Sequence, residues 1–148
     1  MDSLTTDKYM DELEKNILDI QEIFSKCSTQ ESIYSKIMEL GRLLPRLEPK
    51  FLTSDLLVQG CQSQMFLLST IEDQKMYFKA YSDALISAGL AAILIRLYSG
   101  LSPEIILKHN LSFLEDLGIT NSLSANRSNG LFQIHLRMKQ DALKALIE

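Results

Sequence analysis

The chain has 148 residues, of which 46% are apolar and 23% are charged, and its formal net charge is −4. This length predicts a single domain over residues 1–148, with enough apolar side chains for a hydrophobic core. The acidic balance argues against nucleic acid as a direct partner, because a phosphate backbone attracts basic surfaces. Neither a C-x-x-C nor an H-x-x-x-H spacing occurs, so no metal site is predicted.

The N-terminal residues lack the basic and apolar regions of a signal peptide. The longest apolar run, residues 84–95, is shorter than the ~20 residues that span a bilayer. We therefore expect a soluble, cytoplasmic protein with no membrane partner. In a reducing cytosol, Cys27 and Cys61 are expected to remain free thiols rather than to form a disulfide.

The first third of the chain has the apolar spacing of two amphipathic helices. The first is expected over residues 6–27, within an N-terminal helical region at residues 1–37. One face of this first helix would carry Leu13, Ile17, Ile20 and Phe24. A capping box at residues 28–31, with Ser28 as the cap and Glu31 reaching back, predicts the start of the second helix. Pro45 is expected to end it.

Strand patterns replace the helical spacing between residues 54 and 81. Residues 56–59 and 64–70 resemble short strands, and residues 76–81 alternate between apolar and polar side chains. A turn is expected at residues 72–74. These segments predict a three-stranded antiparallel meander.

Helical patterns return in the C-terminal half of the chain. Ser82 is expected to cap a helix over residues 83–98, which is apolar nearly all round and therefore central. Another helix should begin at residues 102–104, a short one should end at Gly118, and the last should run from about Asn129 to the end. The predicted fold class is α+β: a small three-stranded antiparallel sheet flanked by N- and C-terminal helices.

A polar loop that contains one cysteine lies between the first two predicted strands, at residues 58–64 (Val-Gln-Gly-Cys-Gln-Ser-Gln). Gly60 can adopt a positive φ, which lets the chain reverse and present Cys61 outward. The pattern is compatible both with a structural cysteine and with a reactive one. A thiolate attacks another sulfur atom when its pKa is lowered or when a partner positions it.

Four other side chains are candidates for a role near this loop. Asp83 is typical of a helix N-terminus, and it could also tune the loop that holds Cys61. Arg127 lies in a polar segment and is either solvated or a contact for an anion or partner. Neither His109 nor His135 forms a convincing Cys–His–Asn arrangement, so a nucleophilic Cys61 would need a reactive sulfur brought by a partner.

Residues 58–64 resemble the V-x-G-C-Q-S motif of the SufE family of sulfur acceptors. The resemblance covers about residues 38–145 and continues in order through residues 80–84, 89–100, 102–106 and 127–131. Family members usually differ in carrying an acid at Tyr81, a Trp at Phe66, a Pro-Ser pair at residues 125–126 and a His at Ser122.

The resemblance implies a SufE/IscU-like fold and an accessory sulfur-transfer protein that is not itself an enzyme. It implies that the protein takes persulfide sulfur onto Cys61 from a SufS-like cysteine desulfurase. The protein would also stimulate that enzyme and pass the sulfur to a SufBCD-like iron–sulfur scaffold. No cofactor is implied, because pyridoxal phosphate belongs to the desulfurase, and the chain would be a monomer or weak homodimer. The implied loop and partner-binding residues are Gln59, Gly60, Gln62, Ser63, Asp83 and Arg127.

Four alternatives remain at this stage. A CsdE-like acceptor would relay sulfur to another pathway, such as tRNA modification. An iron–sulfur scaffold would need several thiolates, whereas the loop supplies one. A cysteine-dependent hydrolase would need a base near Cys61 and would turn over without a partner. In a purely structural helical module, alkylation of Cys61 would change nothing.

Overall fold

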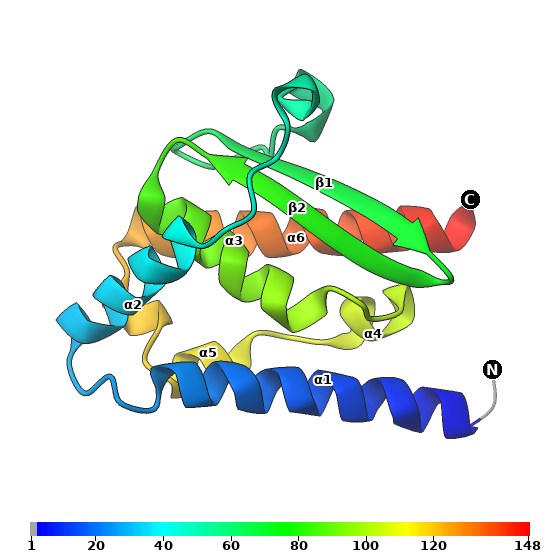
Figure 1. Cartoon of the computed structure of the whole chain (residues 1–148), viewed down its shortest axis with the longest axis horizontal. Coiled ribbons are helices and arrows are strands. Elements are labelled where there is room, and N and C mark those ends of the chain that lie inside the picture. Colours follow the sequence, from blue (N-terminus) through cyan, green and yellow to red (C-terminus); the bar gives the residue numbers. More distant parts are fainter. Residues whose placement is uncertain (1–2) are drawn as a thin grey trace.

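The computed structural model describes the backbone of residues 3–148 and the side chains of residues 11–148 (Figure 1). A two-stranded hairpin packs with helices that come from both ends of the chain, so the predicted α+β class is confirmed. The longer helices are α1 (Ser3–Phe24), α2 (Gln30–Arg42), α3 (Leu85–Tyr98) and α6 (Ala125–Ile147). The remaining elements are strands β1 (Met65–Glu72) and β2 (Lys75–Ser82), the short helices α4 (Pro103–Lys108) and α5 (Ser112–Asp116), and the 3-10 turns η1 (Pro49–Phe51), η2 (Ser54–Leu56) and η3 (Thr120–Ser122).

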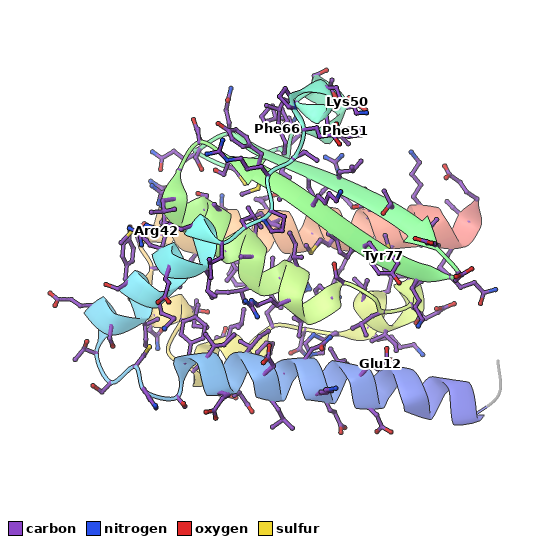
Figure 2. All side chains as sticks on the ribbon, in the orientation of Figure 1. Glu12, Arg42, Lys50, Phe51, Phe66 and Tyr77 are labelled. Carbon is purple, nitrogen blue, oxygen red and sulfur yellow. The ribbon has the colours of Figure 1, made fainter. Side chains whose placement is uncertain are left out.

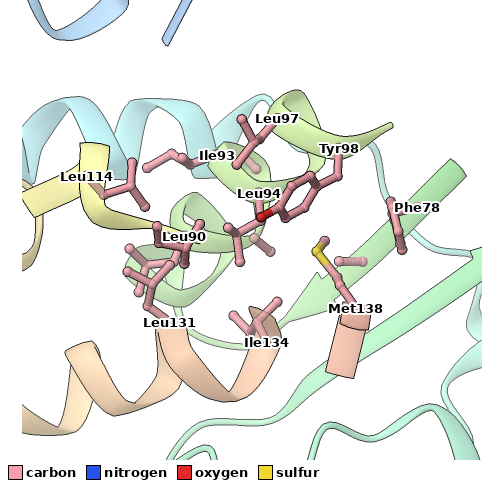
Figure 3. Packing of buried hydrophobic residues seen from close by; sticks show 14 of the residues in the cluster. Phe78, Leu90, Ile93, Leu94, Leu97, Tyr98, Leu114, Leu131, Ile134 and Met138 are labelled. Atoms are coloured by element: carbon pink, nitrogen blue, oxygen red, sulfur yellow. The ribbon is translucent and has the colours of Figure 1, made fainter. Parts of the chain in front are cut away.

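Helix α3 is the central element, as its apolar composition predicts. It packs against α1, α2, α6 and β2, and eleven of its 14 residues are buried. Figure 1 shows α3 between the hairpin on one side and α1 on the other. Figure 3 shows how the core closes: side chains of α3 and α6 face one another, with contributions from α5 and β2. The labelled members of this core are Phe78, Leu90, Ile93, Leu94, Leu97, Tyr98, Leu114, Leu131, Ile134 and Met138.

Helices α2 and α3 approach each other through a pair of glycines. A Cβ atom added at Gly89 would lie 2.0 Å from the backbone oxygen of Ile37, and one added at Gly41 would lie 2.5 Å from that of Leu85. These distances are far below van der Waals contact, and backbone atoms cannot move aside as a flexible side chain can. The absence of a side chain at both positions therefore permits the close crossing that seats α2 on the core.

The hairpin pairs β1 and β2 in an antiparallel register that runs from Met65 opposite Ser82 to Glu72 opposite Lys75. The turn expected at residues 72–74 is confirmed, because Asp73 and Gln74 have φ angles of 52° and 66°. Two consecutive positive φ angles fit a two-residue turn whose twist matches that of the strands.

The prediction of a third strand at residues 56–59 is wrong. This segment makes one isolated bridge, Leu57 opposite Phe66, supported by the hydrogen bond from the Val58 N–H to the Met65 carbonyl (2.8 Å). The 3-10 turn η2 precedes the bridge, and Gly60, with a φ of +84°, turns the chain away after it. Pairing therefore stops after a single bridge, and the described sheet has two strands.

Four helix starts differ from those predicted, the first being that of α1, which begins at Ser3 rather than at residue 6. The capping box of α2 lies one residue later: Thr29 is the cap, and Ser32 takes the role assigned to Glu31. Helix α3 begins at Leu85 after an Ala84 cap that offers no side-chain acceptor, so Asp83 precedes the helix. Helix α6 begins at Ala125 rather than about Asn129.

The side chains are distributed as an amphipathic pattern requires. Figure 2 shows Lys50 and Phe51 on the short helical segment above the hairpin, where the Lys50 ammonium lies 5.2 Å from the Phe51 ring centroid. Phe66 is only 8% exposed and packs 6.4 Å, centroid to centroid, from Tyr81.

Within residues 3–148, no helix combines the length and the apolar character that a membrane crossing requires.

Candidate functional site

Cys61 follows the turn at Gly60, which places its thiol against the start of α6. The sulfur atom is 3.9 Å from the Gly130 carbonyl oxygen, to which the S–H donates a long hydrogen bond. Cys61 is half-buried and packs at the edge of the hydrophobic core. The prediction that Gly60 presents the thiol outward is therefore only partly right, because the thiol rests against a helix instead of pointing into solvent.

Burial raises the pKa of the Cys61 thiol, because the charged thiolate is less well solvated there. In this conformation Cys61 is therefore a protonated, weakly nucleophilic thiol at neutral pH. Any reaction as a nucleophile needs a change in its surroundings that makes the thiolate easier to form.

Two side chains of α6 contact the tip of the loop. The Asn129 side-chain amide donates to the Gly60 carbonyl over 3.0 Å. The Gln133 side chain covers Gly60 so closely that a Cβ atom added there would lie 3.0 Å from its Cδ atom. Gly60 is thus required twice, for its φ of +84° and for this close approach.

Asp83 closes the other end of the loop. Its Oδ1 atom accepts a hydrogen bond from the Gln64 N–H (3.0 Å), while the Ser82 hydroxyl donates to the Gln64 carbonyl (2.7 Å). Both contacts fix the backbone where the loop enters β1. The structure therefore brings Asp83 to the cysteine loop, but as a backbone acceptor rather than as an acid in the first turn of α3.

Arg127 connects three elements through one buried hydroxyl group. It lies in the first turn of α6, and its Nη1 atom donates to the Ser87 Oγ atom of α3 over 3.1 Å. The Ser87 hydroxyl is in turn 2.7 Å from that of Ser63 in the loop. Of the two interpretations of Arg127, the solvated one does not fit, because the side chain is half-buried and donates to Ser87 beside the loop; a contact with an anion or partner stays a prediction.

Two of the residues expected in the site, Gln59 and Gln62, are exposed and make no side-chain hydrogen bond within the described part of the chain. They are free to meet a partner. The sequence reasoning missed Ser87, Asn129 and Gln133. Ser87 could have been noticed as a hydroxyl in an otherwise apolar helix, since a buried hydroxyl needs a partner.

The other candidate groups lie apart from the loop. His109 and His135 both bind the Tyr98 hydroxyl, at 3.0 Å and 2.7 Å, and neither has a hydrogen bond to Cys61. Cys27 follows the end of α1 and is a free cysteine. Among the residues whose side chains are described, no group of three or more His, Cys, Asp or Glu residues could hold a metal ion.

The fold and the site define a small α+β protein with one half-buried thiol on a fastened loop. A family model described as "SufE: Fe-S metabolism associated domain" matches residues 18–142. Because it covers most of the chain, the protein belongs to the SufE family, which is associated with iron–sulfur metabolism.

Individual relatives agree with this assignment. The chain is 32% identical over 132 residues to a SufE-like protein of Synechocystis, covering 88% of this chain and 82% of that one. It is 36% identical over 117 residues to a SufE-like protein of Rhizobium meliloti, covering 76% and 84% of the two chains. The Arabidopsis thaliana chloroplastic/mitochondrial SufE-like protein 1 is 30% identical over 135 residues, which are 90% of this chain and 36% of the plant protein.

The fold is shared with a protein of known structure. The solution structure of a hypothetical protein from Thermus thermophilus superposes with a TM-score of 0.73, covering 90% of this chain and 97% of that one. The two sequences are 22% identical, so this likeness supports the fold alone.

Proposed function

We propose that this protein accepts sulfur from a pyridoxal-phosphate-dependent cysteine desulfurase and carries it as a persulfide on Cys61. The observation that carries the proposal is a half-buried thiol of raised pKa, on a glycine turn, with no base bonded to it. Such a thiol reacts slowly in its rest position and faster when a partner draws it out. Membership of the SufE family gives this partner-dependent thiol a place in iron–sulfur metabolism.

The transfer is a thiol exchange that needs no external oxidant or reductant. The Cys61 thiol gives up its proton to water and, as the thiolate, attacks the outer sulfur of the cysteine persulfide on the desulfurase. A new S–S bond forms on Cys61, the S–S bond on the desulfurase breaks, and the desulfurase cysteine leaves as a thiolate. Stimulation of the desulfurase follows, because removing the sulfur frees its cysteine for another turnover.

The rest position of the loop would protect the product. When the loop returns to α6, the persulfide lies beside the core edge, where reductants have less access than in open solvent. Leaving that position breaks few contacts at the tip itself, namely the Asn129–Gly60 hydrogen bond and the thiol contact with Gly130, while the Ser63–Ser87 and Gln64–Asp83 hydrogen bonds can hold the end that enters β1. Loops held by few contacts open at low free-energy cost.

The downstream partner in this proposal is a SufBCD-like scaffold in the cytoplasm, and the protein acts as a monomer or weak homodimer without a cofactor of its own. A CsdE-like relay of the sulfur to tRNA modification uses the same first step. The two destinations differ in which acceptor discharges the Cys61 persulfide.

The test is to incubate the protein with a desulfurase and cysteine and to measure its intact mass. We expect the wild-type protein and Cys27→Ser to gain one sulfur atom, and Cys61→Ser to gain none. A wild-type protein that gains nothing from several desulfurases, or a Cys61→Ser variant that still gains sulfur, would refute the proposal.

A further inference from the structure

One arginine of α6 joins the backbone that leads into the cysteine loop to that helix, while the Val58–Met65 hydrogen bond joins the same backbone to β1. We call residues 55–58 the stem of the loop. Arg137 donates from Nη1 to the Leu57 carbonyl (3.2 Å) and from Nη2 to the Asp55 carbonyl (2.6 Å). Two arms of one planar guanidinium group therefore bind two carbonyls of the stem, which fixes its direction as well as its distance from α6.

Arg137 is itself held in place by a second pair of contacts. Its Nε atom is 3.2 Å from the Asp141 Oδ1 atom, one helical turn further along α6. The other oxygen of Asp141 accepts a hydrogen bond from the Ser69 hydroxyl of β1 (2.5 Å). The side chains of Arg137 and Asp141 are only 20% and 21% exposed, so solvent competes weakly for these contacts. The stem is thus joined to both α6 and β1.

The stem and the tip of the loop are held with different strengths. Hydrogen bonds from a guanidinium group are roughly twice as strong as those between neutral groups. At the tip, Asn129 contributes one neutral amide donor to Gly60, and the thiol contact with Gly130 is long; the stronger Ser63–Ser87 and Gln64–Asp83 contacts hold the other side of the loop, where it enters β1. Asn129, Gln133 and Arg137 are spaced four residues apart, so a single face of α6 contacts both the tip and the stem.

We propose that Arg137 is a positioning residue: it fixes the stem to α6 and so sets how often the Cys61 thiol leaves its half-buried rest position. While the stem is held, the tip moves as a short loop hinged at residue 58. Without Arg137 the stem keeps only its pairing with β1, the Val58–Met65 hydrogen bond and the Leu57–Phe66 bridge, so its direction relative to α6 is no longer fixed and the thiol reaches solvent more often. Only the purpose of this motion, meeting a desulfurase, rests on the proposed function.

The test is the rate of alkylation of each cysteine by iodoacetamide, followed by mass spectrometry of the separate peptides. In Arg137→Met, we expect Cys61 to react about tenfold faster at pH 8, corresponding to about 1.4 kcal/mol in the opening equilibrium. Its pH profile should also shift, because a thiol that spends longer in solvent has a pKa nearer the ordinary value. Cys27 should react at its wild-type rate, which separates opening of the loop from loosening of the whole fold.

Two further variants sharpen the result. Arg96→Met is the matched control: Arg96 pairs with Asp19 at 3.6 Å on an exposed surface of α3, and its loss should leave Cys61 unchanged. Arg137→Lys keeps the charge but loses the two-armed geometry, so its Cys61 rate should lie between those of wild type and Arg137→Met.

The inference is overturned if Cys61 reacts equally fast in wild type and Arg137→Met, or if the Cys27 rate rises by the same factor. Alkylation needs no desulfurase, so this outcome is separate from the fate of the proposed function. A wild-type protein that gains no sulfur refutes sulfur transfer and leaves the alkylation result standing. A protein that gains sulfur, but whose Cys61 alkylation ignores Arg137, refutes only the role of Arg137.

Discussion

Replacement of Tyr98 by Phe should destabilise the protein strongly, although it removes a single oxygen atom. The Tyr98 ring is fully buried at the end of α3, and its hydroxyl lies 2.7 Å from the His135 Nε2 atom and 3.0 Å from the His109 Nδ1 atom. Burial raises the pKa of Tyr98, so the hydroxyl keeps its proton. It therefore donates to one imidazole and accepts from the other. In Figure 3 this hydroxyl lies among core side chains of α3 and α6.

The expected loss follows from the two ring nitrogens that Tyr98→Phe leaves behind. An unpaired buried polar group costs about 1–3 kcal/mol, and His135 is 8% exposed, so water replaces the lost partner poorly. His109 is half-buried and recovers part of its loss through water. We expect a total loss of about 3 kcal/mol in the free energy of unfolding. Phe retains the stacking of the Tyr98 ring on His135, where the centroids lie 5.5 Å apart, so the loss isolates the hydroxyl.

The assay is urea denaturation at pH 7, followed by far-UV circular dichroism. Tyr77→Phe is the matched control, because Tyr77 is 40% exposed and its hydroxyl has no hydrogen bond in the described structure. This control should change the free energy of unfolding by less than about 0.5 kcal/mol. If Tyr98→Phe were equally silent, the hydroxyl would not be the main partner of either ring and the reasoning would fail.

Three more predictions concern other parts of the molecule. Gly89→Ala should destabilise by about 3 kcal/mol in the same assay, since its Cβ atom would meet the Ile37 carbonyl and overpacking typically costs 1–3 kcal/mol; a neutral result would mean that α2 shifts freely. Burial, followed by the charges of nearby groups, lowers the pKa of His135 from 6.5 to about 4. The unfolded state therefore binds this proton at a higher pH than the folded state does. The contribution of His135 to the free energy of unfolding is fully present above pH 6.5 and falls by about 3 kcal/mol between pH 6.5 and pH 4. Below pH 4 this contribution no longer changes. His135→Gln should flatten that part of a stability–pH curve, and an unchanged slope would assign it to other groups. Asp83→Ala should speed hydrogen exchange at the Gln64 amide, which loses its acceptor, and equal exchange in both proteins would show that Asp83 does not close the loop.

The sequence predicted those parts of the fold that depend on local chemistry. Helix α3 was expected because almost every position is apolar, and the hairpin turn because polar residues interrupt two strands. The false strand at residues 56–59 has a strand-like composition, but pairing needs a partner, and Gly60 leaves room for one bridge. The start of α6 was missed because residues 125–130 are rich in Asn, Ser and Gly, which have low helix propensity. The Ser124 cap and tertiary packing outweigh that propensity.

The candidate site was predicted as a set of residues but not as a geometry. Cys61, Asp83 and Arg127 belong to recognisable motifs, and the structure brings all three to the loop or to its support. The hydroxyl that connects Arg127 to the loop, Ser87, comes from a helix whose pattern indicates only burial. The contact of Asn129 with Gly60 depends on where α6 begins, so an error of one turn concealed it.

The first turns of α6 also hold the cysteine loop, because Arg127, Asn129 and Gly130 all lie there. Helix ends fray more readily than helix centres, and this end is held by the Ser124 cap on the Arg127 N–H (3.3 Å) and by the side-chain hydrogen bonds of Arg127 to Ser87 and of Asn129 to Gly60. Unwinding these turns would break the contacts of α6 with Gly60 and Cys61 and the hydrogen bond from Arg127 to Ser87 in one event, while Arg137, further along the helix, stays helical. The Ser63–Ser87 and Gln64–Asp83 hydrogen bonds would still hold the side of the loop that enters β1, so fraying of the helix end loosens the thiol without detaching the loop.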